Sequence, residues 1–252
     1  MQVVGYDARA PALLVSDAAP DGVGAVSRVP LDPGAELAYA LGDRRCAGAV
    51  DGDTHYACDA PGAPRCREHA TTWVCARCTG TCLKDEMDCL DDHAVYLAAF
   101  APDAFKVGVT RRARLDTRLR EQGADRAAHV RTVGNGRVAR EIEAGIAESI
   151  PDRVRVATKR AGLGRTVDEA AWRDLLADFD PTATFEFDYG LDLDDRPIAE
   201  TLAAGTVRAT KGRLLVLDRG GSTYAVDLRD LVGHEIERGG SARDLQSSLG
   251  AF

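Results

Sequence analysis

All seven cysteines of this 252-residue chain lie between positions 46 and 89, and this cluster constrains the fold more than any other feature. Zinc in a structural site binds four thiolate or imidazole ligands in a tetrahedron, and two ligands separated by two residues can reach one ion. Cys66 and His69 have this spacing, as do Cys75 and Cys78. The ligand-type residues form two sets of four and predict two zinc ions: Cys46, Cys58, Cys66, His69, Cys75, Cys78, Cys82 and Cys89.

Two partitions of these ligands remain open. In a sequential partition, the four residues up to His69 bind one ion and the four from Cys75 bind the other, whereas a cross-braced partition interleaves the two sets. Eight ligands for two ions leave no open coordination position, so we expect structural rather than catalytic zinc. His55 lies within the cluster but has no partner at turn spacing, and we interpret it as a loop histidine rather than a ligand.

A disulfide framework is the alternative explanation of closely spaced cysteines. The odd number of cysteines argues against it, and so does the N-terminal segment MQVVGYDARAPALLV, which lacks a basic and apolar signal pattern. The sequence also contains no apolar run of about 18 residues, the length a membrane helix needs. We therefore expect a soluble, cytoplasmic, metal-binding protein without a membrane partner.

The charge is unevenly distributed along the chain. The net charge is −8, yet the segment from His93 to Arg165 carries 15 basic and 8 acidic residues. A local positive field attracts polyanions, which predicts nucleic acid as a partner; the alternative is an arginine-rich helix face that is merely solvated. The expected nucleic-acid contacts are Arg111, Arg112, Arg114 and Arg120. The excess of arginine over lysine and of aspartate over glutamate is typical of halophilic proteins or of a high-GC genome.

Turn residues and hydrophobic patterns divide the chain into four predicted parts. Short alternating runs separated by Pro, Gly and Asp predict an N-terminal β segment over residues 1–40. The zinc module follows at 41–92, and strands and helices alternate over 93–179. Residues 180–252 return to strands and predict a small C-terminal β-barrel. Within it, RLLVLDRGGSTYAVDL predicts a hairpin, because Gly-Gly tolerates the positive dihedrals of a tight turn.

The central part resembles the GIY-YIG nuclease superfamily. The resemblance rests on Val95-Tyr96-Leu97 on one strand, Lys106-Val107-Gly108 with Thr110 on the next, then a helix with Arg118 and a later helix with Glu143, over about 60 residues. It implies a mixed α+β fold, in which a GIY-YIG-like domain is preceded by the zinc module and flanked by small N- and C-terminal sheets or barrels.

A second resemblance covers about half the chain. The motifs HAVYLA, KVGVTR and EQGA, preceded by the cysteine cluster, are similar to those of a prokaryotic family of unknown function that joins a cysteine-rich zinc module to a GIY-YIG-like domain. Four short motifs in the same order make this likeness more specific than the first. It implies an architecture more strongly than it implies an activity.

The GIY-YIG resemblance implies four catalytic residues. Glu143 would hold a hard cation such as Mg²⁺, Arg118 would clamp a phosphate, and the Tyr96 hydroxyl would lie near the attacking water. Lys106 stands where the superfamily usually has its second tyrosine, and a partly buried lysine with a lowered pKa can act as a base. The asparagine that typically follows the glutamate helix is absent from the stretch AESIPDRVRV.

Each of these residues also has a purely structural interpretation. Tyr96 can be a core residue, and the pairs Arg118–Glu121 and Arg140–Glu143 have the spacing of ordinary helical ion pairs. Three functions therefore remain open: a zinc-containing nucleic-acid-binding protein with RNA favoured, a metal-dependent nuclease, and a scaffold for protein complexes. The basic segment favours the first two, and the missing asparagine and second tyrosine favour binding over cleavage.

Overall fold

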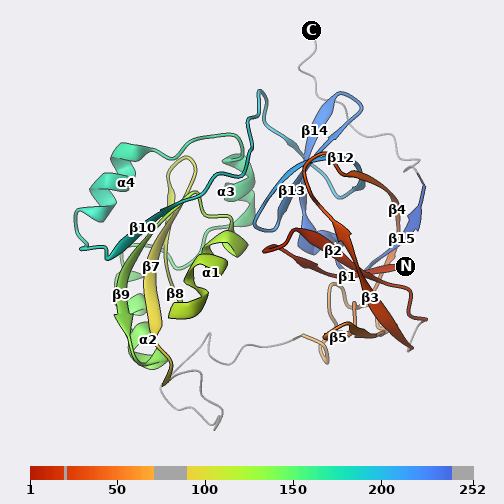
Figure 1. Ribbon diagram of the computed structural model, residues 1–252, viewed down its shortest axis with the longest axis horizontal. Coiled ribbons are helices and arrows are strands. Elements are labelled where there is room, and N and C mark those ends of the chain that lie inside the picture. The colour runs from red at the N-terminus through yellow and green to blue at the C-terminus, as the bar shows by residue number, and fades with distance from the viewer. Residues whose placement is uncertain (20–21, 71–89, 240–252) are drawn as a thin grey trace. The chain divides into compact units, whose positions relative to one another are not determined.

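The computed structural model describes residues 1–19, 22–70 and 90–239 (Figure 1). The chain forms two compact units. Unit 1 comprises Met1–Thr72 together with Tyr189–Phe252, and unit 2 comprises Trp73–Asp188. Both ends of the chain therefore contribute to unit 1, whereas unit 2 is one continuous segment.

Unit 1 is a large, mostly antiparallel sheet. Its strands are β1 Gln2–Asp7, β2 Ala12–Ser16, β3 Val23–Pro30, β4 Glu36–Arg44, β5 Ala49–Asp51, β6 Thr54–Tyr56, β11 Ile198–Ala199, β12 Ala203–Lys211, β13 Leu214–Arg219, β14 Ser222–Asp227 and β15 His234–Arg238, with the short helix α5 Leu228–Leu231 after β14. They lie in the order β11-β14-β13-β12-β4-β15-β1-β2-β3-β6-β5. Strands from the two chain ends are therefore interleaved, since β4 pairs with both β12 and β15, and β15 also pairs with β1.

Alternating polarity explains why these segments are strands with one buried face. In β4, Leu37 and Tyr39 are buried while Glu36 and Ala38 are exposed, which is the period of two that a half-buried strand requires. The central strand β13 is buried from Leu214 through Leu217, as expected for a strand with neighbours on both sides. The side chains meet in one apolar core that draws on both ends of the chain, including Val3, Leu13, Leu37, Leu215, Val226 and Ile236.

The predicted C-terminal hairpin is confirmed. Strands β13 and β14 pair antiparallel, and Arg219 lies opposite Ser222, so that only Gly220 and Gly221 form the turn. Both glycines have positive φ, 57° and 77°, which residues with a side chain adopt only with strain.

The joining of the two chain ends differs from the expected arrangement, in which N-terminal and C-terminal strands fold separately. Val207 in β12 and Ile236 in β15 belong to the same core as Leu37 in β4. Without β12 and β15, both edges of β4 would present unpaired N–H and C=O groups, and pairing satisfies them. The C-terminal strands therefore complete the N-terminal sheet rather than forming a structure of their own.

Unit 2 is built around a four-stranded antiparallel sheet. Its elements are β7 His93–Phe100, β8 Ala104–Arg111, a 3-10 turn at Arg112–Arg114, α1 Leu115–Gln122, β9 Arg126–Val133, α2 Gly136–Ile146, α3 Val156–Ala161, α4 Glu169–Leu176 and β10 Ala183–Glu186. The strand order is β10-β9-β7-β8, so that β7 is central and β8 lies at an edge. The predicted succession of strand, turn, strand, helix, strand and helix over the first part of this unit is confirmed by β7, β8, α1, β9 and α2.

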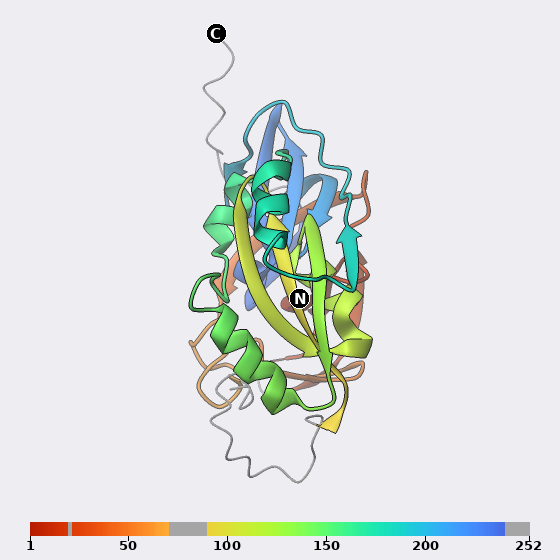
Figure 2. The same ribbon diagram turned by 90° about the vertical axis from the view of Figure 1, so that its left-hand side faces the viewer.

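The two faces of the unit 2 sheet are covered differently. Val95 and Leu97 of β7 pack with Ala139 of α2 and with Trp172 of α4 in one apolar core. Tyr96 points to the other face, where its hydroxyl meets a residue of α1. Figure 2 shows α1 and α2 on opposite sides of this sheet. Side chains at the β8 edge can therefore interact with residues of both helices.

The mixed α+β fold class is confirmed, with more strand than helix. None of the helices in the described part of the chain combines the length and the apolar character needed to cross a membrane.

Candidate functional site

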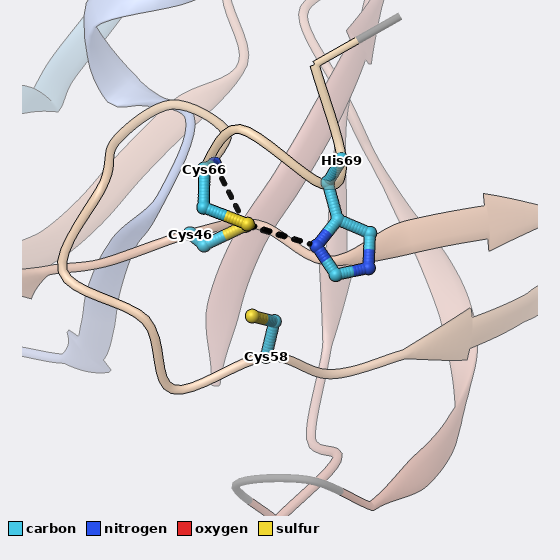
Figure 3. A group of neighbouring side chains, drawn as sticks. All are labelled: Cys46, Cys58, Cys66 and His69. Carbon is cyan, nitrogen blue, oxygen red and sulfur yellow. Dashed lines mark hydrogen bonds between the residues drawn. The ribbon is translucent and has the colours of Figure 1, made fainter.

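Four ligand-type side chains of unit 1 converge at one point (Figure 3). Cys46 follows β4, Cys58 follows β6, and Cys66 and His69 lie in the turn that comes next, and their ligand atoms all lie within 4.8 Å of one another. His69 Nδ1 is 3.2 Å from Cys66 Sγ and 3.6 Å from Cys46 Sγ. The ligand atoms of a tetrahedral zinc site lie about 3.5 to 4 Å apart. The cluster can therefore bind a metal ion such as zinc, and it contains the four residues of the first predicted set.

Hydrogen bonds reach the sulfur atoms of both Cys46 and Cys66. The amides of Gly48 and Cys66 donate to Cys46 Sγ at 3.4 and 3.2 Å, and Cys46 is fully buried. Hydrogen bonds with the His69 side chain and backbone lower the pKa of the Cys66 thiol to about 6. Because the thiolate is the form that binds metal, these contacts prepare the cluster for an ion.

The four residues Cys46, Cys58, Cys66 and His69 form the Cys3His cluster, which is hydrogen-bonded to the sheet of unit 1. The Gln2 side-chain amide of β1 donates to the carbonyl oxygens of Cys46 at 3.3 Å and of Gly233 at 3.0 Å. His55 is not part of the cluster; it is buried in β6, and its Nε2 lies 3.1 Å from the carbonyl oxygen of Ala47. This position agrees with our interpretation that His55 is not a ligand. It differs from the loop position that we expected, because His55 is a buried strand residue. Desolvation lowers its pKa. The second predicted set, Cys75, Cys78, Cys82 and Cys89, lies outside the described residues.

The four residues predicted to be catalytic lie on four different elements of unit 2. Tyr96 belongs to β7, Lys106 to β8, Arg118 to α1 and Glu143 to α2. The Tyr96 hydroxyl accepts a hydrogen bond of 2.7 Å from the side-chain amide of Gln122. Burial raises the pKa of Tyr96; the charge of Arg118 and the Gln122 hydrogen bond partly offset this, while the charge of Glu143 adds to it. The residues are thus close enough to influence one another electrostatically.

Lys106 is the most perturbed cation of this group. Burial lowers its pKa to about 8, and the positive charges of Arg118 and Arg140 act in the same direction. The carboxylates of Glu143 and Asp152 oppose the shift but do not cancel it. A lysine with this pKa is partly neutral just above neutral pH, so it can accept a proton there, or become fully charged beside a bound anion.

Glu143 and Glu141 have different surroundings on α2. The Glu143 side chain is 13% exposed and pairs with Arg140 at 2.5 Å, whereas the Glu141 side chain is 61% exposed and pairs with Arg137 at 3.0 Å. The charge of Glu143 acts on both Tyr96 and Lys106. We call Tyr96, Lys106, Arg118, Gln122, Arg140 and Glu143 the Tyr96 site.

Of the arginines predicted to contact nucleic acid, Arg111 ends β8, Arg112 and Arg114 lie in the 3-10 turn before α1, and Arg120 lies in the last turn of α1. Three of them have acidic partners: Arg111 with Asp91 at 3.7 Å, Arg114 with Glu121 at 2.9 Å, and Arg120 with Asp116 at 2.9 Å. Exposed ion pairs of this kind are weak, so a phosphate can displace the carboxylate. Arg112 is also exposed.

Two members of the Tyr96 site were not singled out for it in the sequence. Gln122 follows Arg118 by four residues, so both lie on the same face of α1, and this spacing could have indicated it. Arg140 was interpreted only as an ion-pair partner of Glu143. That ion pair is present, but Arg140 also contributes to the positive field at Lys106.

A protein family model described as "Protein of unknown function (DUF2797)" matches residues 57–236 of the chain. No curated protein and no solved structure matches the chain.

Proposed function

Because the chain belongs to the DUF2797 family, a family of unknown function, we propose its function from its own residues: it is a zinc-containing nucleic-acid-binding protein, with RNA favoured over DNA. The cationic group of the Tyr96 site carries this proposal. Burial lowers the pKa of Lys106 to about 8, and the positive charges of Arg118 and Arg140 add to this shift. A bound phosphate would relieve this repulsion, and the guanidinium group of Arg118 matches two phosphate oxygens.

The exposed arginines next to this group extend it into a surface. Arg111, Arg112 and Arg114 lie between the end of β8 and the start of α1, the helix that carries Arg118. A nucleic-acid backbone that runs along this segment would have one phosphate at the Tyr96 site and neighbouring phosphates at these side chains. Zinc modules are common in RNA-associated proteins, which is the reason for favouring RNA.

The role proposed for zinc is structural. Two closed sites, one at the Cys3His cluster and one at the set from Cys75 to Cys89, would use all eight ligands. Neither ion would then have an open coordination position for catalysis. The first would hold together the connection that leads from the sheet of unit 1 towards unit 2.

A triple variant tests the binding proposal. Replacing Arg111, Arg112 and Arg114 with glutamine should weaken binding to a short RNA and flatten its dependence on salt by about two to three released counterions. Fluorescence anisotropy of labelled RNA and DNA oligonucleotides, repeated at several salt concentrations, measures both effects. The control variant carries the same change at three exposed arginines outside the basic segment, Arg9, Arg173 and Arg196.

The control variant has the same net charge as the triple variant but should keep the affinity and salt slope of the wild type. Equal losses in both variants would mean that only the overall charge matters. If the wild type binds no RNA or DNA at low salt, the nucleic-acid proposal is wrong, and the scaffold function becomes the better explanation.

Cleavage of a phosphodiester is the second candidate function, because Tyr96, Lys106, Arg118 and Glu143 come together from four elements. Glu143 would hold Mg²⁺, which would stabilise charge on the phosphate, and neutral Lys106 would accept the proton of the attacking water. The pairing of Glu143 with Arg140 competes with such an ion, which is why binding ranks first. Wild-type cleavage that requires Mg²⁺ and disappears in Glu143→Gln would establish the nuclease; we expect no cleavage of generic substrates.

A further inference from the structure

A pocket of about 390 Å³ lies in unit 2, and none of its lining residues belongs to the Tyr96 site. It lies between the start of β8, the segment that joins α2 to α3, and α4. Its volume falls within the range of pockets that bind small ligands.

The apolar part of this pocket favours a flat group. Phe105 lines it and stacks on Trp172 behind it, with ring centroids 5.8 Å apart and an angle of 28° between the rings. Ile150, Val154 and Leu175 also belong to the apolar part of the lining. A planar aromatic ligand can stack on or against the Phe105 ring, which Trp172 holds in place.

The polar part favours an anion. The lining contains two guanidinium groups, those of Arg153 and Arg155, and one carboxylate, that of Asp103. Arg153 is almost fully exposed and lies 3.6 Å from Asp152, so this ion pair is weak. Within the described ranges, Arg155 forms no ion pair. The hydroxyl groups of Ser149 and Thr158 offer further hydrogen bonds to phosphate or ribose.

We propose that this pocket binds a nucleotide, with the base against Phe105 and the phosphate at Arg153 and Arg155. The Asp103 carboxylate can accept hydrogen bonds from ribose hydroxyls. The nucleotide can be free or can be one unit of a strand. Only the second source rests on the proposed nucleic-acid function.

The pocket and the Tyr96 site are connected through the β8 edge. Phe105 and Lys106 are adjacent in β8, so their side chains leave the sheet on opposite faces. The amide of Val107 donates to the carbonyl oxygen of Pro151 at 3.0 Å, which fixes the pocket-lining segment along this edge. Asp152 of the same segment contributes to the field at Lys106. A nucleic-acid strand that crosses the β8 edge could therefore place one phosphate at the Tyr96 site and a base in the pocket.

Tryptophan fluorescence tests the pocket directly, because the chain has only Trp73 and Trp172. In a Trp73→Phe variant the emission comes from Trp172 alone, next to the Phe105 ring. Titration with AMP and with UMP should change this emission in a saturable way, whereas ribose 5-phosphate and inorganic phosphate should not. Equilibrium dialysis with labelled nucleotide measures the same binding without fluorescence.

Two variants locate the ligand. Arg155→Gln should weaken nucleotide binding about tenfold through loss of a charged contact, and Val154→Phe should fill the pocket and abolish binding. Arg173→Gln, an exposed arginine of α4 outside the lining, is the matched control and should bind as the wild type does. Absence of nucleotide binding by both methods overturns the proposal, and so does binding that Arg155→Gln and Val154→Phe leave unchanged.

The same variants separate this inference from the proposed function. The triple variant at Arg111, Arg112 and Arg114 should keep its affinity for a mononucleotide, because none of these residues lines the pocket. If a strand uses the pocket, Val154→Phe should also weaken oligonucleotide binding. If Val154→Phe abolishes mononucleotide binding but leaves oligonucleotide binding unchanged, the pocket binds free nucleotides. Mononucleotide binding without any oligonucleotide binding would support the pocket and contradict the proposed function.

Discussion

The contact between Gly108 and Tyr96 shows how a single missing side chain shapes unit 2. The two residues lie directly opposite one another on β8 and β7. A Cβ atom at position 108 would lie 2.5 Å from both Cζ and the hydroxyl oxygen of Tyr96. The ring cannot easily move, because it is buried and its hydroxyl is hydrogen-bonded to Gln122. Gly108 therefore provides the space that the Tyr96 ring occupies on its strand.

Gly108→Ala should destabilise the protein by about 1 to 3 kcal/mol, because the added methyl group overlaps the Tyr96 ring. Urea denaturation followed by circular dichroism measures the change. Gly145→Ala is the matched control: Gly145 is exposed in α2, and an added Cβ meets no atom within 4 Å. This control should stabilise the protein by about 0.5 to 1 kcal/mol, the helix preference of alanine over glycine. Equal stability of the Gly108→Ala variant and the wild type would contradict the packing argument.

The lowered pKa of Lys106 predicts a pH dependence of stability. The folded chain releases the lysine proton at about pH 8, while the unfolded chain keeps it up to a pKa of 10.5. Between these values the unfolded state binds more protons, so stability rises with pH. The rise should be on the order of 3 kcal/mol in total, with Arg118, Arg140, Glu143 and Asp152 as the charged groups that set it.

Lys106→Met removes this titration and keeps most of the side-chain volume. Urea denaturation of both proteins between pH 7 and 10.5, without added magnesium, gives the difference at each pH. Groups that titrate elsewhere are common to both proteins and cancel. At the lower pH values we expect the methionine variant to be more stable than the wild type, because it has no buried charge. The difference in the free energy of unfolding should shrink as the pH rises. A difference that is constant across this range would show that Lys106 titrates normally.

Among the elements, β5 and β6 depend most on the Cys3His cluster for their stability. β5 and β6 are only three residues each, and Cys46 and Cys58 lie just outside them. Such short strands have few backbone hydrogen bonds of their own, so a bound ion would supply much of the stability of this part.

Cys46→Ser should therefore lower the zinc content from two ions per chain to one and reduce the melting temperature. Elemental analysis of protein purified without added metal measures the content. His55→Gln is the control, because it changes a buried neighbour of the Cys46 loop without removing a ligand, and it should keep both ions. Zinc content that Cys46→Ser does not change would exclude Cys46 as a ligand. A wild type without zinc but with intact disulfides would refute metal binding altogether.

At the scale of the whole molecule, the two units differ in how the chain builds them. Unit 2 is continuous and has its own apolar core, whereas the core of unit 1 requires both chain ends. A fragment of residues 90–188 should therefore fold alone and unfold cooperatively on heating. A fragment of residues 1–72 should not, because β1 and β4 are held together by β15 rather than by each other.

Amide spectra by NMR distinguish the two outcomes for the fragments. Adding residues 189–252 as a separate chain to fragment 1–72, in the presence of zinc, should restore dispersed signals. A folded fragment 1–72 on its own would show that the interleaved strands are not needed for the N-terminal sheet.

Features that depend on neighbouring residues could be predicted from the sequence. The Gly220-Gly221 hairpin needs only the dihedral freedom of two glycines. The order of elements from β7 to α2 follows from local hydrophobic patterns. The burial of Glu143 rather than Glu141 follows from the helical period alone.

The sequence by itself therefore determined the candidate metal ligands, the hairpin and the succession of elements in unit 2, because each depends on spacings along the chain. Only the tertiary structure decided that β12 and β15 enclose β4, since the alternation within a strand specifies which face is buried but not which distant strand pairs with its edge. It also decided that the segment after α2 encloses a pocket at Phe105. Both depend on contacts between residues far apart in the chain, where the packing of the whole core selects one partner.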